Sequence, residues 1–310
     1  MPRFKDDAAL TELLRALEDR AYRFVSVTPA THARVIARRG EAECLRDIFG
    51  WSLPFRRATL GEELFALLDR AGAVEEAGEG LLKSAVRVSS LDEHLFLHSA
   101  YPTDDPDSVF FGPDTYRFVS MLRAELRDAG PVSRLVDIGT GSGAGGIMAA
   151  GMVAGAKPVL LDLNDDALQL AAANARAAGV EAELVHGASL DEVGGEVDLV
   201  IANPPYIMDS QDRTYRDGGG MHGAQISLDW TLAAARRVQP GGRVLLYTGV
   251  AMVKGHDELR ERLEAELPAL GCSLRYYELD PDIFGEELDE PAYRDVERIA
   301  AVCAAVRKQA

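Results

Sequence analysis

Cysteine is scarce in this sequence of 310 residues, which contains three, and basic residues number 33 against 50 acidic ones. Cys44, Cys272 and Cys303 lie far apart in the chain. An odd number of widely spaced cysteines argues against a disulfide framework and against a zinc site. We therefore predict reduced, buried thiols, as in a cytoplasmic protein, and no bound metal.

Long apolar runs are also missing from the sequence. No segment has the unbroken apolar length that a membrane span requires. The first residues, Met-Pro-Arg-Phe-Lys-Asp-Asp, lack the apolar core of a signal peptide. We therefore expect no membrane partner and a cytoplasmic location.

The shortage of basic residues gives the chain a formal net charge of -17. A field of this sign disfavours nonspecific attraction to nucleic acid or to anionic membranes. The charge is uneven, because residues 1–100 contain 14 Lys and Arg against 16 Asp and Glu, whereas the remainder carries a net -15. Any patch that faces nucleic acid is therefore expected within residues 1–100.

Residues 1–100 predict a small α+β domain, followed by a polar linker at 101–107 that holds two prolines. Four segments have apolar residues at helical spacing, and two β-like runs follow them. Helices are predicted over 11–25, with Thr11 as the cap, and over 29–38, 41–49 and 59–71, and strands over 81–88 and 95–98. Helices followed by a β-hairpin indicate a winged-helix-like module, which we interpret as a substrate-recognition domain.

Arginines make residues 1–58 slightly positive, with 11 basic and 8 acidic side chains. Six of them are Arg34, Arg38, Arg39, Arg46, Arg56 and Arg57. The segment predicts either a surface that faces nucleic acid or the ribosome, or an ordinary solvated helix face. No aromatic interleaving accompanies the arginines, which favours the solvated face.

Two pairs of residues near the linker have alternative interpretations. His94 and His98 have the spacing of helical metal ligands, but they fall in a strand-like run without a third ligand nearby, so no metal site is predicted. Phe110 and Phe111 precede a helix predicted over 116–127. Because a pair of exposed Phe side chains is costly, we expect them either to pack on the rest of the protein or to cover a pocket.

From residue 135 the pattern changes to alternating strands and helices, which predicts an α/β domain over 108–310 with a doubly wound, mostly parallel sheet. Strands are predicted over 135–138, 159–163, 183–186, 197–202, 243–248 and 274–279, and helices over 144–154, 165–178, 225–238 and 256–267. The last segment, 298–306, fits either a strand antiparallel to 274–279 or a helix.

A glycine-rich turn, Gly139-Thr140-Gly141-Ser142-Gly143, follows the first of these strands. Glycines allow the backbone to approach a ligand closely. Asp137, just before the turn, can accept hydrogen bonds from turn amides or from a cationic amino group. Asp162, about twenty residues beyond the turn, is placed to bind the ribose hydroxyls of an adenosine.

The same turn also matches a second class of cofactor. Gly141, Gly143 and Gly146 have the dinucleotide spacing G-x-G-x-x-G, so a nicotinamide-dependent oxidoreductase is a rival prediction. A pyrophosphate, however, would meet the adjacent negative charge of Asp137, whereas an ammonium group would be attracted to it.

A second motif, Asn203-Pro204-Pro205-Tyr206, directly follows the predicted buried strand 197–202. Two prolines end the sheet ladder and stiffen the turn at the carboxyl end of a strand, where ligands bind in open α/β sheets. The Asn203 side-chain oxygen and the Pro204 carbonyl are acceptors for both N–H bonds of a planar NH2 group, and Tyr206 can stack on its plane. Holding both donors aims the nitrogen lone pair outward, which positions a weak nucleophile.

In this order, Asp-Ile-Gly-Thr-Gly-Ser-Gly, Asp162 and Asn-Pro-Pro-Tyr resemble class I S-adenosylmethionine-dependent methyltransferases that act on amino nitrogens. The most similar branch is that of the release factor glutamine methyltransferases, which share the tetrad with adenine-N6 and guanine-N2 methyltransferases. The resemblance covers about residues 108–306. It implies a seven-stranded Rossmann-like sheet, S-adenosylmethionine as cofactor and S-adenosylhomocysteine as product.

The resemblance also implies roles for particular residues. Those implied in catalysis are Asn203, Pro204, Pro205 and Tyr206, and those implied in cofactor binding are Asp137, Gly139, Thr140, Gly141, Gly143, Asp162, Leu163, Ala188, Ser189 and Asn203. Three departures from the branch stand out. Phe111-Gly112-Pro113-Asp114-Thr115 replaces its usual Pro-Arg-Pro-Glu/Asp-Thr, and Ala188 replaces an acidic adenine contact, for which Ser189 or a backbone amide is a substitute. The N-terminal part does not resemble the short helical domain of that branch.

We therefore predict an N-methyltransferase that acts on a protein glutamine amide or on the exocyclic amine of a nucleic-acid base. The expected partner is a macromolecule, either a protein such as a translation factor, or RNA or DNA. Two alternatives stay open, namely the nicotinamide-dependent oxidoreductase and a non-catalytic protein that binds S-adenosylmethionine.

Overall fold

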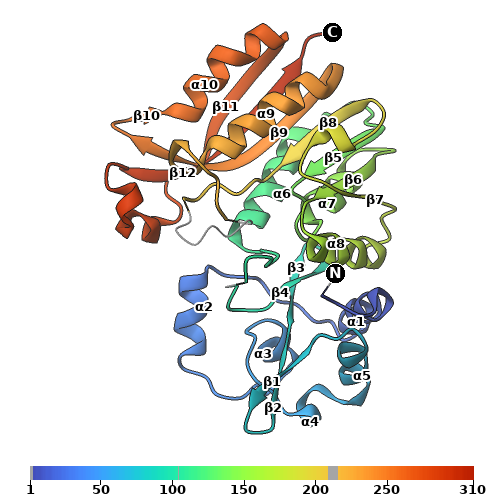
Figure 1. The fold of residues 1–310 in the computed structure, drawn as a ribbon. Coiled ribbons are helices and arrows are strands. Elements are labelled where there is room, and N and C mark those ends of the chain that lie inside the picture. The colour runs from blue at the N-terminus through green and yellow to red at the C-terminus, as the bar shows by residue number, and fades with distance from the viewer. Residues whose placement is uncertain (1–2, 104, 209–215) are drawn as a thin grey trace.

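The computed structural model describes residues 3–103, 105–208 and 216–310, so Asp104 of the predicted linker lies outside the described residues. Figure 1 shows a broad sheet flanked by helices in the upper part of the molecule and a smaller helical part below it. Within the described residues, no helix has both the length and the apolar character needed to cross a membrane.

Over residues 3–103, the N-terminal part has five helices and two hairpins. The helices are α1 (Asp7–Asp19), α2 (Pro29–Ile36), α3 (Leu45–Phe49), α4 (Arg57–Leu60) and α5 (Glu62–Arg70). The strands are β1 (Val74–Gly78), β2 (Leu81–Ser84), β3 (Val86–Leu91) and β4 (His94–Ser99). Strand β1 pairs with β2 and β3 pairs with β4, both antiparallel, in two separate sheets rather than in the one predicted hairpin.

Several predicted helix boundaries in this part are wrong, among them the end of the helix at 11–25, which stops at Asp19, and the start of the helix at 41–49, which begins at Leu45. Helix α1 begins before Thr11, because the Asp6 carboxylate accepts a hydrogen bond from the Ala9 amide at 3.0 Å and caps the helix there. The helix predicted over 59–71 is split into α4 and α5 at Gly61, whose φ of 81° is incompatible with a continuous helix.

The second part forms the predicted doubly wound sheet. Its helices are α6 (Pro113–Leu126), α7 (Ala144–Met152), α8 (Asp165–Ala177), α9 (Gln225–Arg237) and α10 (Glu258–Glu266). Its strands are β5 (Arg134–Ile138), β6 (Lys157–Asp162), β7 (Glu183–His186), β8 (Val197–Ala202), β9 (Val238–Val253), β10 (His256–Asp257), β11 (Cys272–Asp280) and β12 (Arg298–Lys308).

The strand order is β11-β12-β9-β8-β5-β6-β7, and β10 pairs with β9 outside this path. Strands β5, β6, β7, β8 and β9 are parallel, whereas β12 is antiparallel to both β9 and β11. The segment at 298–306 is therefore a strand. Strand β9 is longer than predicted at both ends, because Val238 pairs with Val197 across a register shift and pairing with β12 continues to Met252.

Helices cover both faces of this sheet. Apolar side chains of α9 and α10 pack on the face that carries Val136 and Val200, and those of α6 and α7 pack on the face that carries Leu135 and Leu199. The crossing point of the doubly wound topology lies between β5 and β8, from which the chain turns to opposite sides. The carboxyl ends of these two strands carry the two predicted motifs.

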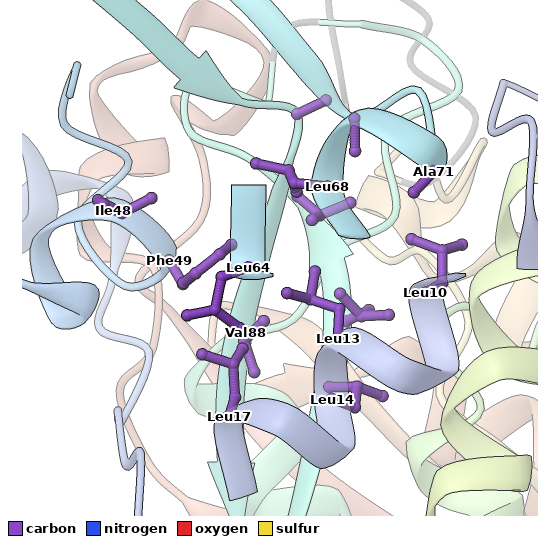
Figure 2. Close-up of a cluster of buried hydrophobic side chains, with 14 of the residues drawn as sticks. Leu10, Leu13, Leu14, Leu17, Ile48, Phe49, Leu64, Leu68, Ala71 and Val88 are labelled. Carbon is purple, nitrogen blue, oxygen red and sulfur yellow. The ribbon is translucent and has the colours of Figure 1, made fainter. Parts of the chain in front are cut away.

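The N-terminal part shares an apolar cluster with helix α8. Figure 2 shows Leu10, Leu13, Leu14 and Leu17 of α1 pointing into a cluster with side chains of α3, α5 and β3. The same cluster includes Ala167, Leu170 and Ala173 of α8. The two parts of the chain are therefore joined by a buried apolar contact and not only by the linker.

Candidate functional site

A cavity of about 400 Å³ lies at the carboxyl ends of β5, β6 and β8. The glycine-rich turn, the end of β6 and the proline-containing tetrad line it together, and residues 106 and 108–110 close one side. This is the topological switch point, where open α/β sheets bind their ligands, and the volume suits a small organic molecule.

The glycines of the turn have different positions. Gly139 and Gly141 line the cavity with φ of 66° and 52°, and a Cβ on Gly141 would have no atom within 4 Å. Gly143, in contrast, is absent from the described residues that line the cavity. A Cβ there would lie 3.0 Å from Cβ of Ala171 in α8, so Gly143 allows close packing of that helix, and its role in cofactor binding stays a prediction.

The two predicted acidic residues both line the cavity and both hold the turn. The Asp137 Oδ2 accepts hydrogen bonds from the Thr140 hydroxyl and the Gly146 amide, each at 2.7 Å. Burial raises the pKa of Asp137 to about 7. The Asp162 carboxylate accepts bonds from the Gly141 amide at 2.8 Å and the Asn164 amide at 2.9 Å, and burial raises its pKa.

The tetrad begins where β8 ends, as the sequence predicts. Asn203, Pro204, Pro205 and Tyr206 all line the cavity. The Oδ1 atom of Asn203 is buried and has no hydrogen-bond partner among the described residues. A buried acceptor without a partner is rare in proteins, because it loses its hydration without compensation. Its oxygen is therefore available to a donor that enters the cavity.

The ring of Tyr206 is more enclosed than the prediction of a stacking platform requires. Tyr206 is 8% exposed, and a Cβ on Gly249 of β9 would lie 2.4 Å from its ring. The Phe284 ring meets it edge-on, with centroids 5.8 Å apart. One face of Tyr206 thus packs on β9, and contact with a ligand is restricted to the part of the ring that borders the cavity.

Sequence reasoning missed Asp114, a buried carboxylate in the cavity wall at the start of α6. It accepts a hydrogen bond from the Tyr247 hydroxyl at 2.5 Å, and Arg117 lies 3.3 Å away. Burial raises the pKa of Asp114, and burial also raises the pKa of Tyr206 beside it. Pro113-Asp114-Thr115 resembles part of the motif of the methyltransferase branch, but the segment itself does not indicate a contact with Tyr247.

Two aromatic residues of the cavity wall, Trp230 and Phe284, were also not predicted from the sequence. Trp230 of α9 borders the turn, since a Cβ on Gly139 would lie 2.7 Å from its ring. Phe284 lies between β11 and β12 and adopts a left-handed conformation with φ of 53°. Such a conformation is costly for a bulky side chain and is found mostly where function or packing requires it.

The remaining predicted cofactor residues divide into two groups. Leu163 and Ala188 line the cavity, and Leu163 is 54% exposed, which is unusual for a large apolar side chain. Ser189 is not among the described lining residues. Its hydroxyl instead accepts a hydrogen bond from the Asp191 amide at 3.1 Å and caps η1 (Leu190–Glu192).

The structure distinguishes between the alternatives given above for the residues near the linker. Phe110 lines the cavity, whereas Phe111 is buried and stacks on Phe96 and His98. His98 is buried, and its Nε2 lies 2.8 Å from the Ser89 hydroxyl.

The three cysteines differ in exposure. Cys272 and Cys303 are free and buried as predicted, but the free Cys44 is exposed, because it precedes the short helix α3 at the surface.

Much of the chain around this cavity is similar to known proteins. Residues 115–246 match the family model described as Methyltransferase small domain. The chain is 28% identical over 189 residues to the release factor glutamine methyltransferase of Deinococcus radiodurans, covering 60% of this chain and 66% of that protein. It is 32% identical over 153 residues to the enzyme of the same name from Mycobacterium leprae, covering 44% of this chain and 52% of that protein.

The fold has a counterpart among solved structures. Trm5b from Pyrococcus abyssi matches with a TM-score of 0.51 at 14% identity, covering 76% of this chain and 62% of that one. At this identity the likeness concerns the fold alone. The matched segments span about two thirds and about half the length of the two curated relatives. Residues 115–246 are therefore similar to the Methyltransferase small domain, and part of the chain is similar in sequence to release factor glutamine methyltransferases.

Proposed function

We propose that this protein is an S-adenosylmethionine-dependent N-methyltransferase. Its acceptor is a planar amino nitrogen, on a protein glutamine amide or a nucleic-acid base. The observation that carries this proposal is the buried, unpartnered Oδ1 of Asn203 in a cavity that it shares with a glycine-rich turn. The methyltransferase small domain at 115–246 and the homologous release factor methyltransferases support the reaction class.

The residues around the turn fit the proposed cofactor. A Cβ on Gly141 would meet no atom within 4 Å, so this part of the cavity is open to a ligand, and the Asp137 carboxylate, which also lines the cavity, is an acceptor for an ammonium group. The Asp162 carboxylate has lone pairs beyond those that bind the turn amides and is available to ribose hydroxyls. The exposed Leu163 and Ala188 offer an apolar wall for an adenine ring. The cofactor, when bound, supplies a methyl group already activated on a sulfonium.

The tetrad residues then have one task, which is to position a weak nucleophile. The Asn203 oxygen and the Pro204 carbonyl accept the two N–H bonds of the acceptor, so its lone pair is directed away from them. Tyr206 and Phe284 limit where a flat group can lie. Because the leaving group is a neutral thioether, alignment and exclusion of water supply most of the acceleration, without a strong base.

Two other functions make different predictions for ligand binding. A nicotinamide-dependent oxidoreductase would be stabilised thermally by a nicotinamide dinucleotide, and not by S-adenosylmethionine. A non-catalytic protein would bind S-adenosylmethionine but transfer no methyl group. Melting temperatures with each cofactor, followed by a transfer assay, separate the three.

The direct test is transfer of labelled methyl from S-adenosylmethionine into a cell lysate, which is then divided into protein, RNA, DNA and small-molecule fractions. We expect label in a macromolecular fraction with the wild-type protein and background label with Asn203→Ala. Label confined to small molecules would refute a macromolecular substrate, and no label at all would leave the non-catalytic protein as the better account.

The free thiols, of which Cys44 is exposed, support a reducing compartment such as the cytoplasm.

A further inference from the structure

The N-terminal part contains a basic surface within a strongly acidic protein. From residue 20 to residue 40 the sequence has arginines and no Asp or Glu, although the whole chain carries a net charge of -17. We call the arginines exposed on and beside helices α2 and α3 the α2 basic face. They are Arg23, Arg34, Arg38, Arg39 and Arg46.

Three of these cations are not neutralised by neighbours. Within residues 3–103, 105–208 and 216–310, Arg34, Arg38 and Arg46 make no ion pair. Arg23 has only a distant partner, Glu93 at 3.8 Å, while Arg39 is paired with Asp47. Exposed guanidinium groups without carboxylate partners keep their hydrogen-bond donors free for an incoming anion.

The tertiary structure supplies the aromatic side chains that the linear pattern did not place among the arginines. The Arg39 guanidinium lies 5.4 Å from the ring centroid of Trp51, which is partly exposed. Arg46 lies 5.9 Å from the ring of Phe24, which is itself buried. Trp51 also packs against Phe24 and His32, with ring centroids 5.1 and 5.2 Å apart, so only part of its indole is exposed beside the unpaired arginines. The surface thus combines free cations with one partly exposed aromatic ring, which the linear pattern of the sequence did not indicate.

The α2 basic face is connected to the cavity through short contacts. The ring of His32 in α2 lies tilted against that of Tyr101, with centroids 4.1 Å apart, and Tyr101 precedes residues 106 and 108–110, which line the cavity. The Ser26 amide donates to the Tyr116 hydroxyl of α6 at 3.0 Å. Helix α6 carries Asp114 in the cavity wall. Figure 1 shows α2 on the same side of the view as the loops between β11 and β12, which carry Phe284.

We propose that the α2 basic face binds the phosphate backbone of a single-stranded segment of RNA and directs one of its bases to the cavity. This inference rests on the proposed function and names the class of its substrate. Arginine matches phosphate geometry with paired donors, and a partly exposed tryptophan can stack on an unpaired base. An unpaired loop presents exocyclic amines without the cost of extrusion from a duplex, which favours RNA over double-stranded DNA.

The test is fluorescence anisotropy with the full-length protein and a labelled RNA hairpin that has a single-stranded loop. A duplex DNA of the same sequence and a poly-glutamate peptide serve as competing ligands. The variant R34Q/R38Q/R46Q should bind the RNA at least tenfold more weakly at about 50 mM salt. Loss of three phosphate contacts should also reduce the slope of log affinity against log salt by about 2.

A matched control removes three arginines from the end of the sheet that lies opposite the cavity. Arg127 and Arg236 lie at the C-terminal ends of α6 and α9, and Arg307 of β12 pairs in register with Arg243 near the start of β9. The variant R127Q/R236Q/R307Q should keep RNA affinity within twofold. Equal losses in both variants would show that net charge alone matters, and would overturn the proposal. Poly-glutamate or duplex DNA bound as tightly as the RNA would overturn it too.

The same protein samples are titrated with S-adenosylmethionine by calorimetry. Loss of RNA binding with cofactor affinity retained in R34Q/R38Q/R46Q supports the assignment. A wild-type protein that binds the cofactor but not the RNA contradicts the RNA inference alone. A wild-type protein that binds RNA but not the cofactor contradicts the proposed function and leaves the RNA surface standing.

Discussion

At the scale of single residues, the polar groups of the cavity differ in whether they already have hydrogen-bond partners within the protein. The Asp137 and Asp162 carboxylates are held by turn amides, whereas the Asn203 oxygen has no partner among the described residues. An unused buried acceptor costs about 1–3 kcal/mol. A ligand that donates a hydrogen bond to the Asn203 oxygen would recover this free energy. We therefore infer that Asn203 binds a ligand, whereas the two carboxylates also hold the backbone of the site in place.

The first residue-scale prediction concerns Asn203. Asn203→Ala should lower turnover by about 10²–10³, because it removes a preorganised acceptor for the amino group. Affinity for S-adenosylmethionine should stay within about twofold, measured by calorimetry. A comparable loss of cofactor affinity would mean that Asn203 acts on the cofactor and not on the acceptor.

The second concerns Gly141, for which the chain offers a matched control. Gly141 and Gly155 both have positive φ, and a Cβ on either would meet no atom within 4 Å, but only Gly141 lines the cavity. Both Gly→Ala variants should lose about 1 kcal/mol of stability to backbone strain. Gly141→Ala alone should weaken cofactor binding, by tenfold or more. Similar affinities in the two variants would place the cofactor elsewhere.

The third concerns the pH dependence that the buried Asp137 imposes. Its pKa of about 7 lies above the usual 3.8, so the folded state binds more protons than the unfolded chain between about pH 4 and 7. The free energy of unfolding should therefore fall as the pH rises through this window, by on the order of a few kcal/mol from this group. Asp137→Asn, whose amide oxygen can still accept from Thr140 and Gly146, should lack this fall. Urea denaturation at several pH values measures the difference, and parallel profiles would show that Asp137 is ionised throughout.

At the scale of elements, helix α8 connects the site to the N-terminal part. The Asn174 side chain is fully buried. It accepts a hydrogen bond from the Leu97 amide at 2.8 Å and donates to the carbonyls of Leu97 and Ser142, at 3.0 and 2.8 Å. One amide thus ties β4 to the glycine-rich turn. The position of the turn depends on β4 as well as on the sheet that carries it.

This arrangement predicts that Asn174→Ala acts at a distance from the cavity. The variant leaves three backbone groups without their partner in a buried place, so it should lower the free energy of unfolding by about 2–4 kcal/mol. Because Ser142 is part of the turn, affinity for S-adenosylmethionine should also fall. Denaturation and calorimetry measure the two effects. Asn164→Ala is a control for the stability effect alone, since Asn164 caps α8 without reaching β4 but lines the cavity itself, and it should cost about 1 kcal/mol.

At the scale of the whole molecule, the proposed parts 1–100 and 108–310 share buried surface. The cluster around α1 includes Leu170 of α8, and Phe4 and Gln169 exchange hydrogen bonds through their main-chain and side-chain groups. A part that buries apolar surface against its neighbour loses that stabilisation when the neighbour unfolds. We therefore propose that the two parts unfold together.

The two tryptophans allow a direct measurement of this coupling. Trp51 lies in the N-terminal part and Trp230 lies in α9, so Trp230→Phe and Trp51→Phe each leave a reporter in one part. Urea transitions followed by fluorescence should have the same midpoint in the two variants, after correction for the small stability change of each substitution. Leu170→Ala should shift both transitions together, with a loss of about 2–5 kcal/mol. Two separate midpoints would show independent domains.

The sequence by itself determined the α/β sheet and the order of its motifs, because these depend on local signals. Strands at 183–186 and 197–202 were predicted to the residue, and the glycines and prolines mark turns that few other residues can form. The match of residues 115–246 to a methyltransferase domain agrees with that prediction.

Only the tertiary structure decided which side chains meet. The placement of Asp114 against Tyr247, of Trp51 against Arg39 and of Asn174 between two segments joins residues far apart in the sequence. Gly143 and Ser189 fit the linear motif but face helix packing and a helix cap instead of the cavity. Local propensity sets the course of the backbone, but side-chain contacts depend on how distant elements pack, and no short segment contains that information.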